Sequence, residues 1–469
     1  MPKDLRTFIA SLSEEHPNEI VRVARPVDPA WEIAAVVRRF QAENQFPTLF
    51  FEDVKGSSMP VMTNLFASRL KLAAALDVSV EETLNEYMRR EDRPIEPRWV
   101  EDGPVKECKW IGEEADLSRL PIVTHGEKDA GPYINPGVGI AKDPDTGVHN
   151  AGIYRHMYRN PREMGIDIGP ESHLAHILRK REEKGEDLEF AVALGHHPAF
   201  CHGSQVRGLL ELDEFAVIGG LLGEPLELVK GETVDLGVPA RAEIVIEGRI
   251  RAGVREEEGP LGEFTWHYGP ARENPVVEIT AITHRRDAIF LDLNNLYLDH
   301  NYLGLLGRES NLYKRVKEAI PSMRNVVVAE SGGCRLTGFV QIRKEFEGQG
   351  KNAALAALAA DPYMKMVVVV DEDVDIYSER EVMWAMTTRT QPDRDFFFVP
   401  GSFVCIIDPS GHTGRSRNEH GGMNTRVGID ASRPVDIPFP ERCDVKRDLW
   451  EGIDLAEYVT SPVGAGHRP

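Results

Sequence analysis

The sequence predicts an α/β protein of more than one domain, in which a small β-barrel lies between two α/β regions. The chain has 469 residues, more than one hydrophobic core usually organises. Alternation of apolar and polar residues, typical of antiparallel strands, is concentrated in its middle part. Helical periodicity and short, fully apolar runs dominate both flanks. We therefore divide the chain into residues 1–115, 116–309, 310–440 and a terminal helix and tail, 441–469.

The first region is predicted to mix helices with a buried strand. Asp28-Pro29 offers a capping side chain and a proline suited to a first helical turn, and apolar residues then recur at helical spacing up to Phe40. Residues 48–51 form a short apolar run, as a buried strand would. Further helices are expected over 69–76 and from about Val80.

The middle region is predicted to be a barrel with helical insertions. Residues 242–248 and 276–282 alternate, which indicates half-buried antiparallel strands, and 288–291 is a further strand candidate. Glycine and proline punctuate these runs at short intervals, which is typical of a small barrel. A helix over 173–183 is one expected insertion.

The third region returns to an α/β pattern. Strands are predicted at 325–328 and 366–370, and the Ala/Leu-rich segment 352–360 is predicted to be a helix between them. Ser378 and Glu381 form a capping box for a helix that runs past Trp384 to Arg389.

The last segments are predicted to be a loop and a helix. Residues 409–425 are rich in Gly, Arg and Asn, and Arg415, Arg417 and Arg426 suit either a phosphate or a partner subunit. A helix over 446–459 follows a proline-rich stretch and is suited to dock on a partner subunit.

Composition and charge exclude several classes of protein. The net charge is −21 and no long basic tract occurs, so binding to nucleic acid or to an anionic membrane is not expected. The first residues lack the apolar core of a signal peptide, and no apolar run reaches the roughly 18 residues of a membrane span. Five scattered cysteines without a C-x-x-C pair indicate reduced thiols in a cytoplasmic protein.

The most distinctive stretch of acidic residues is Glu258-Gly259-Pro260-Leu261-Gly262-Glu263. Its Gly-Pro and Gly suit a bend that turns both carboxylates inward, although an acidic surface loop is an equally good interpretation. Arg155 favours the first interpretation, because a guanidinium can pair with carboxylates bidentately and shift their pKa. A glutamate held beside such an arginine can transfer a proton, and the arginine can grip a substrate carboxylate.

Metal ligands are harder to identify from spacing. Asn150, His173 and Glu227 would make an O/N/O set suited to Mn²⁺ or Mg²⁺, but no local motif links them. The adjacent His196-His197 would point to opposite faces of a strand. The acidic run at 371–375 has a simpler explanation, since negative charge is favoured ahead of a helix N-terminus.

Taken together, these motifs resemble the UbiD family of decarboxylases, the enzymes that use prenylated FMN. The resemblance runs nearly from end to end of the chain. It rests on segments that include Arg25-Pro26-Val27-Asp28-Pro29, Leu49-Phe50-Phe51-Glu52-Asp53-Val54-Lys55-Gly56, Glu227-Leu228-Val229-Lys230, the acidic hexapeptide and Gly428-Ile429-Asp430-Ala431.

The resemblance implies a UbiD-like fold with an N-terminal α/β part, a split β-barrel that binds the flavin, and a C-terminal α/β oligomerisation domain. It implies prenylated FMN as cofactor, together with Mn²⁺ (or Mg²⁺) and K⁺. The family's metal ligands fall on Asn150, His173 and Glu227, and Gly203 with Ser204 would line the K⁺ position.

The resemblance also implies catalytic roles. Glu258, Arg155 and Glu263 correspond to the family's Glu-Arg-Glu network, and the backbone around Ile153 and Tyr154 would face the flavin. The flavin would act as the electron sink for loss of carbon dioxide. Glu263 would then supply the proton that replaces carbon dioxide, while Arg155 positions both the substrate carboxylate and Glu263.

The implied activity is decarboxylation of an aromatic, heteroaromatic or α,β-unsaturated acid, reversible at high carbon dioxide. His300 and Arg308 are candidates to bind a second polar group of the substrate, which would suit a furan-dicarboxylate-like or hydroxybenzoate-like acid. The alternative is that His300 packs at a domain junction and Arg308 forms a salt bridge at the start of a helix.

Two other classes of function remain open from the sequence. One is a plain FMN split-barrel oxidoreductase, which would need no acid–arginine–acid trio. The other is a catalytically inactive assembly subunit. For the decarboxylase, the expected partners are the carboxylic acid substrate and carbon dioxide, a flavin prenyltransferase of the UbiX type that supplies the cofactor, and further copies of the chain in a homodimer or hexamer.

Overall fold

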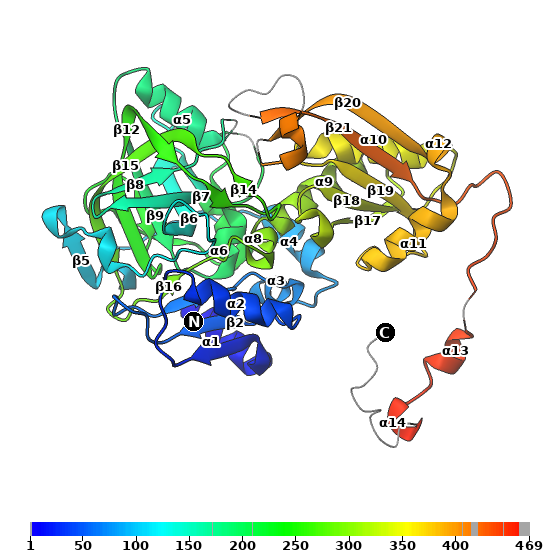
Figure 1. Cartoon of the computed structure of the whole chain (residues 1–469), viewed down its shortest axis with the longest axis horizontal. Helices are drawn as coiled ribbons and strands as arrows, with labels where there is room; N and C mark the ends of the chain where they lie inside the picture. The colour runs from blue at the N-terminus through cyan, green and yellow to red at the C-terminus, as the bar shows by residue number, and fades with distance from the viewer. Residues whose placement is uncertain are drawn as a thin grey trace.

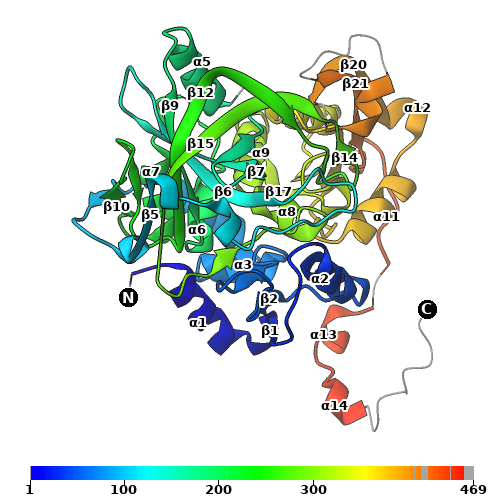
Figure 2. The ribbon, with the colours of Figure 1, turned by 60° about the vertical axis from the view of Figure 1, so that its left-hand side comes forward.

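The structure of the protein is a computed structural model that describes residues 2–170, 172–208, 210–405, 407–413, 421–443 and 445–458. A β-barrel lies beside an α/β domain, and the N-terminal region packs beneath them (Figure 1). One buried apolar cluster joins all three regions, since it includes Leu5, Val138 and Val340. The regions therefore form one packed body, from which the C-terminal segment extends (Figures 1 and 2).

The N-terminal region is a small sheet with helices. Its elements are α1 (Leu5–Glu15), β1 (Ile20–Val23), α2 (Glu32–Ala42), β2 (Thr48–Phe51), β3 (Val61–Thr63), α3 (Arg69–Ala75), α4 (Thr83–Glu91) and, from much later in the chain, β16 (Phe290–Leu291). The sheet has the order β1-β2-β3-β16. The predicted strand at 48–51 is confirmed as β2. The helix predicted after Asp28-Pro29 begins later, because Asp28 accepts a hydrogen bond from the Ala30 amide and caps a turn instead.

The central region is the predicted barrel. Its strands are β6 (Tyr133–Lys142), β7 (His149–Asn160), β8 (Glu163–Ile166), β9 (Leu188–Leu194), β12 (Ile244–Glu258) and β15 (Arg272–His284). They follow the order β12-β9-β6-β7-β8-β15, and antiparallel pairing of β12 with β15 closes the barrel. Figure 2 shows these two long strands arching together over one side of it. The predicted alternating segments 242–248 and 276–282 lie in this closing pair.

Shorter elements complete the central region. They are β4 (Arg98–Trp99), β5 (Cys108–Ile111), α5 (His173–Glu182), α6 (Pro198–Gly203), α7 (Glu214–Leu222), β10 (Glu227–Lys230), β11 (Gly237–Pro239), β13 (Leu261–Gly262) and β14 (Tyr268–Gly269). A separate small sheet has the order β11-β10-β4, and β13 pairs with β14 as a hairpin. The predicted strand at 288–291 is β16, which pairs with β3 rather than with the barrel.

The C-terminal domain is an α/β sheet of order β17-β18-β19-β21-β20. Its elements are α8 (Leu298–Leu303), α9 (Leu305–Ala319), β17 (Met323–Val328), β18 (Thr337–Ile342), α10 (Gln349–Ala360), β19 (Met366–Asp371), α11 (Glu379–Arg389), α12 (Pro392–Asp395), β20 (Phe396–Cys405) and β21 (Gly421–Asp430). The predicted capping box is found only in part: the Ser378 side chain accepts a hydrogen bond from the Glu381 amide at 3.3 Å, but the Glu381 carboxylate accepts from the Asp375 amide at 3.0 Å instead of from Ser378. The division predicted between residues 309 and 310 falls inside α9, which connects the domain to the rest of the body.

Two predictions about the end of the chain need correction. The loop predicted over 409–425 is too long, because β21 begins at Gly421 and pairs with β20; residues 414–420 lie outside the described residues. The single helix predicted over 446–459 is divided into α13 (Arg447–Trp450) and α14 (Leu455–Tyr458) by a turn at Gly452, and residue 459 is likewise outside the description. Among the described residues, no helix has the length and apolar character needed to cross a membrane.

Candidate active site

Arg155 lies at the centre of a buried network of carboxylates. It projects from β7, where its Nε and Nη2 donate to the two oxygens of Glu258 at 3.1 and 2.9 Å. Its Nη1 donates to Oε1 of Glu263, and its Nη2 lies 3.3 Å from Oδ2 of Asp167. The guanidinium is thus shared by three carboxylates and paired bidentately with one of them. Asp167 was not anticipated from the sequence.

The acidic hexapeptide makes the predicted inward bend. Glu258 ends β12, and Gly259 follows with φ of +92°, a conformation that disfavours residues with a Cβ. The bend returns the chain as β13, so that Glu263 reaches the same guanidinium from the other side. Asn274 holds Glu258 by donating to its Oε2 at 2.8 Å. The alternative of an exposed acidic loop is excluded, because Glu258 and Glu263 are 0% and 4% exposed.

The network sets the protonation of Glu263. Burial raises the pKa of its carboxyl to about 7, with Arg155 opposing this shift and the charge of Asp167 adding to it. Burial also disfavours the charged guanidinium of Arg155, but the surrounding carboxylates outweigh it and hold the arginine pKa well above its ordinary value. Glu263 is therefore an acid that can change protonation near neutral pH beside a cation that does not.

Arg155 and Glu263 line a cavity of about 170 Å³. Its other polar walls come from Asp167, from the amide side chains of Asn135, Gln205 and Asn295, from His300 and from Arg335. Burial first, and then the charge of Arg335, lower the pKa of His300 to about 3, so its ring is neutral. The cavity therefore presents two acidic side chains, Glu263 and Asp167, and two guanidiniums, of which Arg335 was missed from the sequence.

A second cavity, of about 440 Å³, adjoins the first. The two share Ile153, Tyr154 and Gln205 in their walls, so they lie next to each other between the barrel and the C-terminal domain. Tyr154 fits beside β6 because residue 139 is glycine; a Cβ there would approach the Tyr154 ring to 2.8 Å. Ile153 and Tyr154, whose backbone is predicted to face the flavin, line both cavities.

The far end of the larger cavity holds a set of metal-type donors. Glu214 Oε1 lies 3.1 Å from the Asn150 amide nitrogen and 3.3 Å from Nδ1 of His173. Among the described residues, the buried Asn150 amide oxygen has no hydrogen-bond partner, and a cation would satisfy it. Carboxylate, amide oxygen and imidazole form an O/N/O set that suits Mn²⁺ or Mg²⁺, so these residues fit a divalent ion.

Local sequence explains how two of these donors are held. His173 is the first residue of α5, and the preceding Ser172 caps the helix by accepting from the Ala175 amide at 3.2 Å. Glu214 likewise begins α7, which Asp213 caps through the Phe215 amide at 2.8 Å. Both side chains are thus fixed at helix N-termini that open onto the cavity.

The structure does not place Glu227 with Asn150 and His173. Its carboxylate accepts from Arg98 and from Arg241, each at 2.6 Å, on the small sheet of β10. Glu227 is absent from the residues that line the larger cavity, and Glu214 takes its place. Local sequence does not reveal this position of Glu214, since Asp213-Glu214 before an apolar run indicates only a helix start.

The residues predicted for the K⁺ position separate in the structure. Ser204 lines the larger cavity and donates its hydroxyl to the Cys201 carbonyl at 2.8 Å, which leaves its oxygen lone pairs free to accept. Gly203 faces α7 instead, where a Cβ would come 2.5 Å from Cγ1 of Ile218. Gly203 therefore serves close helix packing.

Of the two predicted substrate residues, only His300 lines the smaller cavity. Arg308 donates to Asp361 at 2.6 Å and stacks over Tyr363 at 4.8 Å, so the alternative of a structural salt bridge describes it. The acidic run at 371–375 is also structural, because Arg389 pairs with Asp371.

The remaining predicted residues have structural roles or are not described. His196 and His197 are buried and outside both cavities. Arg426 donates to backbone carbonyls, including that of Pro362 at 2.9 Å, and Arg415 and Arg417 lie outside the described residues.

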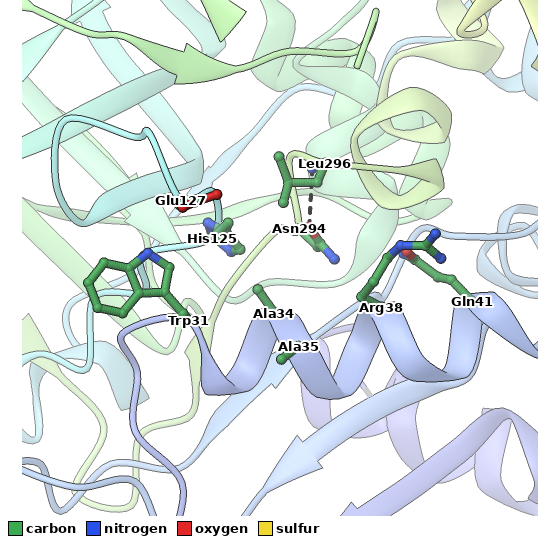
Figure 3. A pocket seen from close by; sticks show the side chains of 9 residues that line it. All are labelled: Trp31, Ala34, Ala35, Arg38, Gln41, His125, Glu127, Asn294 and Leu296. Atoms are coloured by element: carbon green, nitrogen blue, oxygen red, sulfur yellow. Dashed lines mark hydrogen bonds between the residues drawn. The ribbon is translucent and has the colours of Figure 1, made fainter. Parts of the chain in front are cut away.

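A third cavity, of about 520 Å³, lies on the other side of residues 293–296. Figure 3 shows its wall on α2 below and His125, Glu127, Asn294 and Leu296 above. Leu293 and Asn295 line the smaller cavity instead, so neighbouring side chains of this segment lie on opposite sides of it. The segment therefore separates the active-site cavity from this outer groove.

The fold and the site together define a barrel enzyme that handles a carboxylate beside a large cofactor cavity. Comparison with known proteins agrees. Family models of 3-octaprenyl-4-hydroxybenzoate carboxy-lyase match residues 13–91 (N-terminal domain), 98–295 (Rift-related domain) and 301–431 (C-terminal domain). The chain belongs to the UbiD family of carboxy-lyases, which sets aside the plain flavin oxidoreductase.

Individual relatives cover almost the whole chain. Anhydromevalonate phosphate decarboxylase of Methanothermobacter thermautotrophicus is 37% identical over 92% of this chain and 97% of its own, and phenolic acid decarboxylase of Bacillus subtilis is 32% identical over 92% of this chain and 93% of its own. The UbiD-class enzyme HmfF from Pelotomaculum thermopropionicum, solved in complex with FMN, superposes with a TM-score of 0.90 at 42% identity, covering 97% of this chain and all (100%) of its own. An evolved dimeric form of HmfF, solved with prFMN, has a TM-score of 0.86 at 40% identity over 97% of this chain and 100% of its own.

Proposed function

We propose that this protein is a prenylated-FMN-dependent decarboxylase of an aromatic, heteroaromatic or α,β-unsaturated carboxylic acid, and that it works in reverse at high carbon dioxide. The observation that carries the proposal is the Glu258–Arg155–Glu263 network, which borders a small cavity that shares wall residues with one large enough for a flavin. The structures of HmfF with FMN and with prFMN support the choice of cofactor.

The site has a role for each member of the network. When bound, the prenylated flavin supplies the electron sink that loss of carbon dioxide requires. Arg155 orients the substrate carboxylate, and Glu263 in its protonated form gives its proton to the substrate carbon that has lost carbon dioxide. The carboxylate left on Glu263 is then stabilised by Arg155, which Glu258 holds in place by its bidentate pair.

We assign Asn150, His173 and Glu214 as the residues that would hold Mn²⁺ or Mg²⁺, with K⁺ near Ser204. These donors sit where the larger cavity is richest in polar groups, which suits a phosphate tied to the protein through the metal. The cofactor would come from a flavin prenyltransferase of the UbiX type. The exposed apolar side chains of α13 and α14, such as Trp450 and Leu455, support a homodimer or larger homo-oligomer.

Glu214→Gln should weaken Mn²⁺ binding by at least about 10- to 100-fold, because a neutral amide replaces the one carboxylate of the donor set. Equilibrium dialysis with metal analysis measures this directly. Glu227→Gln is the matched control, since its carboxylate is paired with Arg98 and Arg241, and it should leave Mn²⁺ affinity unchanged. The opposite pattern would restore Glu227 as the ligand.

The rate should fall as pH rises through about 7, because Glu263 must be protonated to donate and its pKa is raised to about 7. A plot of kcat/KM against pH should show one descending limb there. The same shift affects stability. The folded protein binds the Glu263 proton more tightly than the unfolded chain does. The stability that this proton adds is therefore complete below pH 4.5, the ordinary pKa of a glutamate, and is lost as pH rises through about 7. A profile that is flat from about pH 6 to 9 would contradict the role of Glu263.

The proposed function is tested by carbon dioxide release from a panel of aromatic, heteroaromatic and unsaturated acids. Protein from cells that also express a flavin prenyltransferase should release carbon dioxide from at least one acid, and protein from cells without it should not. Equal release from both preparations would exclude the prenylated cofactor. No release from either would favour the inactive assembly subunit.

A further inference from the structure

Glu263 follows directly on the first strand of a very short hairpin. β13 and β14 have two residues each, and Gly262 lies opposite Tyr268. Within the hairpin, the Glu263 amide donates to the His267 carbonyl at 3.0 Å. Two-stranded hairpins are only marginally stable by themselves. The position of the Glu263 backbone therefore depends on the contacts that the surrounding chain makes with this hairpin.

The residue before Glu263 is held at both of its backbone groups. The Gly262 amide donates to Oδ1 of Asp129 at 2.9 Å, and the Gly262 carbonyl accepts from the side-chain amide of Asn295 at 2.7 Å. Leu296 lies against the same residue, since a Cβ at position 262 would come 2.4 Å from its Cδ2 atom. Side chains from two distant segments, one before β6 and one after β16, thus fix a single peptide of β13.

The loop that contains Asp129 is shaped for this contact. The other carboxylate oxygen of Asp129 accepts from the Gly126 amide at 2.6 Å. Position 126 requires glycine, because a Cβ there would lie 2.7 Å from Oδ1 of Asp129. The loop also contacts the second strand of the hairpin, where the Lys128 amide donates to the Tyr268 hydroxyl at 3.1 Å. Asp129 is therefore held in place before it contacts Gly262.

These contacts complete the positioning of the proton donor. Arg155 binds the carboxylate end of Glu263, whereas Asp129 and Asn295 fix the backbone from which that side chain starts. An acid must lie within about 2.6–3.2 Å of the atom that it protonates. A displacement of about 1 Å can lower a rate by about 100-fold. A shift of β13 would therefore slow proton transfer even if the Arg155 network remained intact.

Asp129 can influence the reaction only through the hairpin. It is absent from the residues that line the two active-site cavities, whereas Asn295 lines the smaller one. Substitution of Asn295 would thus change the wall that the substrate meets, and substitution of Asp129 would not. Asp129 is for this reason the residue at which positioning can be measured separately from substrate binding.

We propose that Asp129 and Asn295 are positioning residues that hold the Gly262 peptide, so that Glu263 can deliver its proton to the substrate. The proposal rests on the proposed function, in which Glu263 is the proton donor. Asp129 acts through the Gly262 amide and takes no part in the transfer itself.

The kinetic test compares two substitutions of Asp129 in protein loaded with prenylated FMN and Mn²⁺. The substrate is the acid of the panel from which the wild type releases carbon dioxide fastest. Asp129→Ala should lower kcat by about 10- to 100-fold and leave KM within about twofold, because the donor moves while the cavity keeps its walls. Asp129→Asn keeps one acceptor oxygen in place of two, and should recover part of the lost rate. It also replaces the alanine variant if that protein does not fold.

Glu127→Ala is the matched control. It removes an acidic side chain from the same loop, but Glu127 is exposed on the wall of the outer groove (Figure 3) and should leave kcat within about twofold. Unchanged kcat in both Asp129 variants would overturn the proposal. A rise in KM or a loss of flavin large enough to account for the lower rate would overturn it as well.

Amide hydrogen exchange tests the contact without turnover. In Asp129→Ala, peptides that span residues 259–269 should exchange about 5- to 10-fold faster than in the wild type, the effect expected for loss of one hydrogen bond. Exchange as slow as in the wild type would contradict the role of Asp129 in holding the hairpin. Failure of the proposed function would appear separately, as absence of carbon dioxide release from wild-type protein that holds prenylated FMN.

Discussion

Glu263→Gln should reduce carbon dioxide release by about 100- to 10,000-fold, the range that a positioned acid contributes to catalysis. The amide keeps the shape of the side chain and can still lie beside Arg155, but it has no proton to give. Because Glu263 lines the smaller cavity and not the metal-type donor set, flavin and Mn²⁺ contents should match those of the wild type. Single-turnover kinetics together with the flavin spectrum of the same sample measure both.

Glu257→Gln is the control for this substitution. It makes the same chemical change one residue before Glu258, on a side chain that faces solvent, and should leave the rate within a factor of about two. A Glu263→Gln protein that turns over like the wild type would remove Glu263 from the mechanism. Loss of flavin from that variant would instead show that the side chain serves binding.

Arg155→Met should abolish activity and also destabilise the protein by about 3–5 kcal/mol, the usual result of removing one partner from a buried ion pair. Glu258, Glu263 and Asp167 would remain buried around an uncharged side chain. Urea unfolding followed by circular dichroism would report the loss of stability as a lower midpoint.

The pH dependence of this loss identifies its cause. Arg155 opposes the rise that burial causes in the pKa of Glu263, so without the guanidinium the folded form should bind the Glu263 proton still more tightly than the unfolded chain does. The destabilisation should therefore be smaller near pH 5 than near pH 8. Arg159 lies on the same strand as Arg155 and pairs with the half-exposed Glu256. Arg159→Met breaks this pair and should lower the free energy of unfolding by only about 1 kcal/mol. An Arg155 variant as stable as Arg159→Met at both pH values would contradict the described network.

Local patterns in the sequence were enough to find most elements and the centre of the site. The apolar runs of β2 and β19 and the N-cap serine of α11 are recognisable because their determinants lie within a few residues of one another. The acidic hexapeptide belongs to the same class, since Gly259-Pro260 forces the bend that brings Glu258 and Glu263 together. Whether Arg155 would meet them was a question of barrel closure, and there the family resemblance supplied the expectation.

What the sequence could not show depends on contacts between distant segments. Glu214 and Glu227 lie at opposite ends of the region around α7. Only the folded chain shows that Glu214 contacts Asn150, whereas Glu227 is paired with Arg98 and Arg241. Arg308 and Arg335 present the same problem, because a guanidinium's role depends on whether an acid such as Asp361 reaches it. Residues 288–291 had the composition of a strand, but their partner β3 lies more than two hundred residues earlier.

The most direct test of the account is the identity of the flavin that the protein holds. The protein should be produced together with a flavin prenyltransferase and Mn²⁺, and its cofactor released and examined by mass spectrometry and absorbance. The account predicts the mass of prenylated FMN and a spectrum distinct from that of FMN. Ordinary FMN, or no flavin, on folded protein that contains its metal would contradict it.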